Sequence, residues 1–158
     1  MRPQANAMHE QADKLIPELS EWNSGAGIGM LSWVRCVGRL DHAVAYAAYL
    51  WLDFVVHDDC VFLRVPDLAN YDDWMRQCGG DRTRVESVMN HLHLAEMFGD
   101  AAFEPSPDAL THLGRLLSDM WSCKLRRDFP DRRVTVALSG AGSDELLDYE
   151  ITVYQERD

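Results

Sequence analysis

The sequence lacks any paired cysteine motif. Its four cysteines are widely and irregularly spaced, with no Cys-x-x-Cys pair: Cys36, Cys60, Cys78 and Cys123. This spacing argues against a zinc knuckle or a dithiol redox site. Free thiols are typical of a reducing compartment, so we expect a cytoplasmic protein that needs no disulfide.

Long apolar runs and leader-like segments are also missing. The longest nearly uncharged stretch, residues 43–56, is interrupted by Asp53, whereas a membrane-spanning helix needs about 20 apolar residues. The first thirty residues do not combine a charged start, an apolar run and a small-residue cleavage site. We therefore expect a soluble protein that does not bind membranes.

Basic residues are scarce. The chain has 15 Lys+Arg against 26 Asp+Glu, which gives a net charge of -11. A negative field repels nucleic acid and speeds encounter with a basic protein. Solubility alone is the other explanation of such a charge. The balance excludes a nucleic-acid partner and leaves a basic protein as the favoured one.

Apolar and aromatic residues are plentiful. They make up 47% of the 158 residues, with five Trp, five Tyr and five Phe, as expected for a globular protein. A chain of this length fits one domain and buries about 69% of its unfolded surface. We expect a disordered tail over residues 1–9 and a single compact domain over residues 10–158.

Hydrophobic periodicity predicts an α+β fold with about five helices packed on short antiparallel hairpins, because helices and strands come in blocks. The helices are expected over residues 10–22, where Pro17 should start the helix late or kink it, over 42–52, 70–78 and 81–98, and from Ser106 to a point before Pro130. The strands are expected over residues 32–37, 54–57, 60–65, 133–139 and 149–155. Because the 42–52 segment is apolar nearly all round, we expect it to be central. The helix from Ser106 carries the cleanest apolar stripe and is expected to be the main packing element.

Two glycine-rich segments resemble phosphate-binding loops only at first sight. Gly25, Gly27 and Gly29 follow a predicted helix instead of a strand, which is the wrong context for an anion site. The segment 140–145 follows a strand but continues into Asp144 and Glu145, which would repel phosphate. Both segments are therefore predicted to be connecting loops.

His91, His93 and Glu96 have the residue types of a metal site. If residues 81–98 are helical, His91 and His93 point about 200° apart and do not ligate one ion, so we expect no metal. Glu96 then lies on the buried face with Val85 and Met89, where a carboxylate needs a partner such as His93. His93 and Glu96 are thus candidate catalytic residues, with a structural contact near the helix end as the alternative.

A second group of candidates is the run His57-Asp58-Asp59-Cys60. A hairpin turn here could bring the His57 imidazole to the Cys60 thiol, as nucleophilic catalysis requires. Adjacent carboxylates raise a thiol pKa, however, which opposes a reactive thiolate. His57 and Asp58 remain candidate catalytic residues, and a polar turn closing the hairpin is the alternative.

The C-terminal segment is acidic and carries two tyrosines. Its candidate partner-binding residues are Asp144, Glu145, Asp148, Tyr149, Glu150 and Tyr154. Such an edge suits a basic protein, and a solvated terminal strand is the alternative.

Three functions are consistent with these observations. The leading hypothesis is a small acidic interaction protein that binds and neutralises a basic partner, as an immunity protein or antitoxin does, without a cofactor and without catalysis. The second is a small metal-dependent or acid–base enzyme using His57, Asp58, His93 and Glu96. The third is a ligand-binding domain built around the Trp-rich core.

Overall fold

The structure, a computed structural model, describes residues 14–64, 68–97 and 105–157. The chain divides into two units, residues 1–46 and 47–158, and each is described by itself. The predicted disordered tail, residues 1–9, lies outside the described residues. Helices and antiparallel strands are both present, so the predicted α+β class is confirmed.

The first unit consists of short helices. A 3-10 helix, η1 (Pro17–Ser20), precedes α2 (Trp22–Gly25). In its described part, the helix expected over 10–22 does not run through Pro17, the position where a late start or a kink was expected. Proline has no N–H to donate and a fixed φ, so it begins η1 instead of continuing a helix through position 17. Asn23 and Ser24 then adopt positive φ values of 54° and 58°, which end the helical path.

Two predictions fail at α3 (Met30–Val37) and α4 (Leu40–Leu50). The extended segment expected over 32–37 is helical. Helix α4 forms close to where a helix was expected, but none of its residues is buried, and Leu40 is 82% exposed. An apolar composition indicates that a helix is suited to burial, but it does not indicate which other element packs against it. The predicted central position is therefore wrong for most of residues 42–52, although Leu52 at the end of this segment is buried in the core and Leu50 packs against it.

In the second unit, the end of α4 is followed by a β-hairpin of β1 (Phe54–His57) and β2 (Cys60–Leu63). Asp58 and Asp59 form the two-residue turn with φ values of 46° and 63°. Positive φ at both positions is the type I′ geometry that matches the twist of paired strands. The predicted hairpin is confirmed.

Helices α5 (Tyr71–Gln77) and α6 (Arg82–Met89) follow. Asp81 caps α6, since its side chain accepts a hydrogen bond from the Arg84 N–H. Helix α6, however, ends nine residues before the predicted helix over 81–98 does. The chain continues as a short strand, β3 (Leu92–His93), and a 3-10 helix, η3 (Leu94–Glu96).

The long helix α7 (Pro107–Asp128) is confirmed as the main packing element. Ser106 Oγ accepts from the Ala109 N–H and Pro107 occupies the first helical position, which is a strong helix start. Its apolar stripe enters the larger core, and its buried members are Leu110, Leu117, Trp121 and Leu125. No helix among the described residues is both long and apolar enough to cross a membrane.

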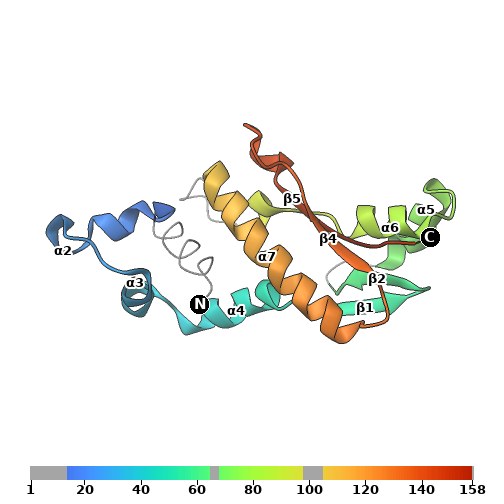
Figure 1. Ribbon diagram of the computed structural model, residues 1–158, viewed down its shortest axis with the longest axis horizontal. Helices are drawn as coiled ribbons and strands as arrows, with labels where there is room; N and C mark the ends of the chain where they lie inside the picture. The colour runs from blue at the N-terminus through green and yellow to red at the C-terminus, as the bar shows by residue number, and fades with distance from the viewer. Residues whose placement is uncertain (1–13, 65–67, 98–104, 158) are drawn as a thin grey trace, which may run out of the picture. The chain divides into compact units, whose positions relative to one another are not determined.

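A three-stranded sheet completes this unit. Strand β5 (Glu150–Gln155) lies between β3 and β4 (Val134–Leu138), and both pairings are antiparallel. The strand predicted over 149–155 is confirmed, and its side chains alternate: Ile151 and Val153 are buried, while Thr152 and Tyr154 are partly exposed. Helix α7 packs against β4, and α6 packs against β5 and β2 (Figure 1).

Candidate metal centre

The site begins where α6 ends. Asn90 follows the last residue of α6 and turns its side chain into the core, where it is completely buried. Its Oδ1 accepts from the Leu63 N–H, and its Nδ2 donates to the carbonyls of Val61 and Val153. These bonds to two strands hold the chain in place at Asn90, so residues 91–93 leave the helix in an extended path.

This extended path brings two histidines and a glutamate together. In a strand, residues two apart lie on the same face, and His91 and His93 obey this rule. Glu150 is the cross-strand partner of His93 in the β3–β5 pairing. The side chains of His91, His93 and Glu150 each offer a ligand atom, and these atoms lie within 4.8 Å of one another.

Individual distances define the cluster. His91 Nε2 lies 3.2 Å from His93 Nε2 and 3.5 Å from Glu150 Oε1. Two nitrogens bound to one tetrahedral zinc ion at about 2.0 Å are about 3.3 Å apart, so the observed imidazole separation already matches that of a shared ion. The three side chains are 34%, 32% and 30% exposed, which leaves one side of the cluster open to water.

Further contacts orient the ligands. His93 Nδ1 lies 2.6 Å from the carbonyl oxygen of Leu147. A carbonyl only accepts, so Nδ1 carries the proton and the lone pair of neutral His93 is on Nε2, which faces His91. Ser139 Oγ donates to Glu150 Oε2 at 3.2 Å. Hydrogen bonds of this kind fix the tautomer and orientation of metal-bound imidazoles and carboxylates.

The prediction that His91 and His93 point apart is wrong, and so is the expected pairing of His93 with Glu96. Both rested on a helix over residues 91–98, whereas the chain is extended at Leu92–His93 and Glu96 is exposed in η3. Among the described residues, the recorded polar partners of His93 are His91, Leu147 and Glu150. The His-x-His spacing was the available signal, but it points to a shared site only when the backbone is extended.

The His57–Cys60 run forms the polar turn of the hairpin. Tyr71 Oη donates to Asp58 Oδ2 at 2.7 Å, and Arg82 donates to the same carboxylate. These two hydrogen bonds, that of Tyr71 first, lower the pKa of Asp58. The His57 ring contacts the Tyr71 ring edge-on, and His57 is paired with Cys60 as a cross-strand neighbour at the end of the hairpin.

Cys60 itself is fully buried. Burial, followed by the negative charge of Glu86, raises the pKa of its thiol. A raised pKa keeps the sulfur protonated and opposes nucleophilic chemistry. The geometry of this run therefore favours the turn over catalysis.

A buried polar network at the other end of β5 was not predicted. Glu86 on α6 is completely buried. It accepts from the backbone N–H groups of Val61 and Gln155 at 2.6 and 2.8 Å, and it pairs with Arg157 at 2.7 Å. Of the predicted buried face of this helix, Val85 is buried and Met89 is half-buried. The buried face is rotated toward Glu86 and Asn90.

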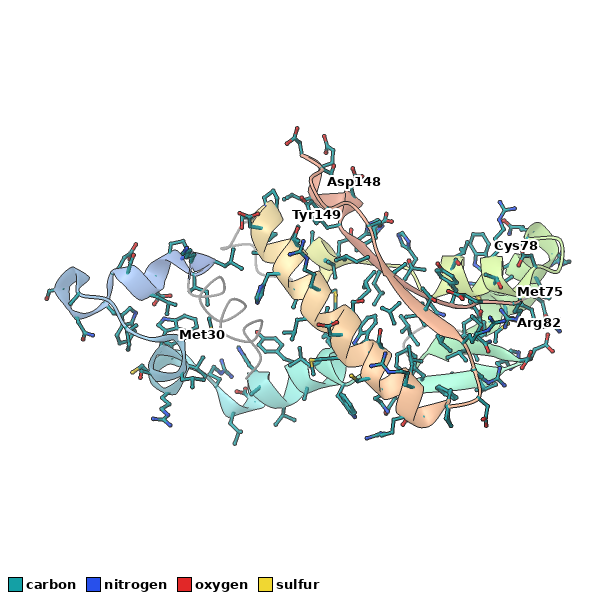
Figure 2. All side chains as sticks on the ribbon, viewed as in Figure 1. Met30, Met75, Cys78, Arg82, Asp148 and Tyr149 are labelled. Atoms are coloured by element: carbon teal, nitrogen blue, oxygen red, sulfur yellow. The ribbon has the colours of Figure 1, made fainter. Side chains whose placement is uncertain are left out.

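The acidic C-terminal candidates fall into separate environments. Asp144, Glu145 and Asp148 are exposed in the loop before β5, and Tyr154 is partly exposed on β5 itself. Tyr149 is only 1% exposed, and its hydroxyl donates to the Ser143 carbonyl. Its ring is part of the core, so it is not available to a partner, and its assignment to a docking surface is corrected. Figure 2 shows Asp148 and Tyr149 where this loop meets β5, with Arg82 near the other end of the strand.

Comparison of the chain with family models, with curated proteins and with solved structures finds no match.

Proposed function

We propose that this protein binds one divalent transition-metal ion through His91, His93 and Glu150. The observation that carries the proposal is the 3.2 Å separation of the two Nε2 atoms, with the lone pair of His93 directed at His91 by the hydrogen bond of its Nδ1 to Leu147. One ion between these two atoms and Glu150 would satisfy all three groups together.

The donor set favours a transition metal over magnesium or calcium. Imidazole nitrogens suit zinc, copper, nickel and iron, whereas magnesium and calcium prefer oxygen ligands. Two imidazoles and one carboxylate are also the ligands of several zinc hydrolases, in which a water molecule takes the remaining position and loses a proton near neutral pH. The open side of the cluster supports this type of site, and a metal-dependent enzyme is the activity class it fits.

Calorimetric titration of the metal-free protein with zinc is expected to show one binding site per chain. Replacing His91 or His93 by glutamine, or Glu150 by glutamine, should weaken binding by at least about 100-fold, since loss of even a supporting contact costs about 10–100-fold. His42→Gln alters an exposed histidine of the first unit and serves as the matched control. Equal affinities in the ligand variants and the control would refute the proposal.

Recognition of a basic protein is the second candidate function. The net charge of -11 and the exposed carboxylates of Asp144, Glu145 and Asp148 favour it. Peripheral charges act mainly on the rate of encounter. For a basic partner captured from a lysate, we therefore expect the association rate to fall with added salt.

The triple variant Asp144→Asn, Glu145→Gln, Asp148→Asn is expected to lower the same association rate while leaving the dissociation rate nearly unchanged. Stopped-flow kinetics at two salt concentrations would measure both rates. A partner whose binding is indifferent to this triple variant would rule out the loop as its docking surface.

A further inference from the structure

We infer that the bound metal ion holds the loop between β4 and β5 in its closed conformation, so that metal occupancy controls how this loop is presented. The inference rests on the proposed metal site and concerns its regulation. The loop comprises residues 139–149 and is called here the acidic loop. Its exposed carboxylates are Asp144, Glu145 and Asp148.

Both ends of the acidic loop meet at a metal ligand. The Ser139 N–H donates to the Glu150 carbonyl at 3.0 Å, and Ser139 Oγ donates to the Glu150 carboxylate at 3.2 Å. Glu150 thus binds the beginning of the loop with its backbone and its side chain, while it also follows the loop's last residue. The Glu150 side chain therefore connects the closed loop to the metal position.

The second metal-bound tether is His93. Its Nδ1–H donates to the carbonyl of Leu147 at 2.6 Å, and Leu147 belongs to the 3-10 helix η4 (Leu146–Asp148) within the loop. The residue after β3 also binds the acidic loop, through its backbone. The Leu94 N–H donates to the Tyr149 carbonyl at 2.8 Å. Two of the three metal ligands consequently bind the acidic loop directly.

Inside, the acidic loop is closely bonded to itself. Ser143 Oγ donates to Asp148 at 2.6 Å, and Tyr149 Oη donates to the Ser143 carbonyl at 3.0 Å. Gly140 has a φ of 78°, and a Cβ there would lie 2.0 Å from the Asp148 carbonyl oxygen, so only glycine allows this approach. These bonds make the loop one body, and its opening breaks its contacts with Glu150, His93 and Leu94 and exposes the Tyr149 ring.

A metal ion on His93 Nε2 strengthens the tether on the other nitrogen. The ion withdraws electron density from the imidazole, and Nδ1–H becomes a stronger donor to Leu147. It also fixes the Glu150 side chain that accepts from Ser139. Any opening of the loop that displaces these two ligands must release the ion. Bound metal therefore raises the equilibrium ratio of closed to open loop by the factor 1 + [M]/Kd, which is about 100-fold at 100 times Kd.

Hydrogen exchange at individual amides tests the inference on the full chain. We expect zinc at 100 times its Kd to slow exchange in residues 140–149 by up to about 100-fold relative to the same protein with chelator. Amides around Leu117 in the core of α7 report global unfolding and provide the internal reference. The inference requires that the loop amides exchange by local opening, faster than those of α7, in the metal-free protein. Zinc must then slow the exchange of these loop amides.

Variants separate the tethers from the ligands. His91→Gln removes a ligand that lies outside the acidic loop, so it should abolish the zinc-dependent gain in loop protection. Glu150→Gln is the second ligand variant, in case the first does not fold. Ser139→Ala keeps all three ligands and should retain most of the zinc affinity, but the gain in loop protection should shrink. The His42→Gln control should behave as the unaltered protein does.

Each outcome decides between the two proposals. Zinc binding in a 1:1 ratio with unchanged loop exchange overturns the inference and leaves the proposed function standing. The inference is also overturned if zinc protects the loop amides from exchange no more than global stabilisation, measured at the α7 amides, would. Absence of zinc binding in calorimetry overturns both, and a loop-specific gain that disappears in His91→Gln supports both.

Discussion

Replacing Glu86 by alanine is expected to lower the free energy of unfolding by about 3–5 kcal/mol, because it breaks a buried ion pair from one side. The Glu86 side chain is completely buried and joins three segments of the second unit. It accepts from Val61 on β2 and from Gln155 on β5, and it pairs with Arg157. Its removal leaves two buried N–H groups unsatisfied and Arg157 without its counter-charge, and each loss is costly.

Chemical denaturation monitored by circular dichroism would measure this change. Glu145→Ala is the matched control, since Glu145 is exposed and the substitution should stay within about 0.5 kcal/mol of neutral. Similar losses for the two variants would show that Glu86 does not join β2 to β5 in the way described. Because Glu86 contacts Gln155, at the opposite end of β5 from Glu150, zinc affinity of the folded variant is expected to be retained.

Trp121→Ala is expected to cost about 3–5 kcal/mol, the range for removing a large aromatic side chain from a core. Trp121 is completely buried on α7, and its Nε1–H donates to the Tyr49 carbonyl at 2.7 Å. Its ring also packs edge-on against Phe54, with centroids 6.4 Å apart. The substitution would therefore create a cavity and also remove the hydrogen bond from Trp121 to Tyr49.

Trp51→Ala provides the comparison within the same unit. Trp51 is 41% exposed and lies beneath the cationic groups of Lys124 and Arg127. Exposed cation–π contacts contribute about 0.5–1 kcal/mol, so this variant should lose much less stability than Trp121→Ala. Thermal unfolding of the two variants side by side would measure the difference, and equal losses would contradict the placement of α7 in the core.

Several elements of the second unit follow from local patterns. Helix α7 has a capping Ser106, a proline at its first position and an apolar stripe, and all three signals lie within the helix that they predict. The hairpin follows from two short β-branched and aromatic runs around Asp58 and Asp59, and strand β5 follows from simple alternation. Such elements are predictable because the residues that specify them are neighbours in the sequence.

The C-terminal boundary of α6 was not predictable in this way. The apolar residues Val85, Met89 and Leu92 continue a helical spacing, so the pattern extends the helix beyond its true end. The helix ends earlier because the Asn90 side chain hydrogen-bonds to Leu63 and Val153, which are 27 and 63 residues away in the sequence. A local pattern carries no information about partners at that separation.

The candidate site depends on this boundary. The sequence by itself determined the residue types, the His-x-His spacing, the acidic balance and the alternation of β5. Only the tertiary structure decided that residues 91–93 are extended, that Glu150 lies opposite His93, and that Tyr149 faces the core. The physical reason is that two histidines two residues apart point in different directions on a helix and in the same direction on a strand. Hydrogen bonds from Asn90 to strands distant in the sequence keep this segment extended.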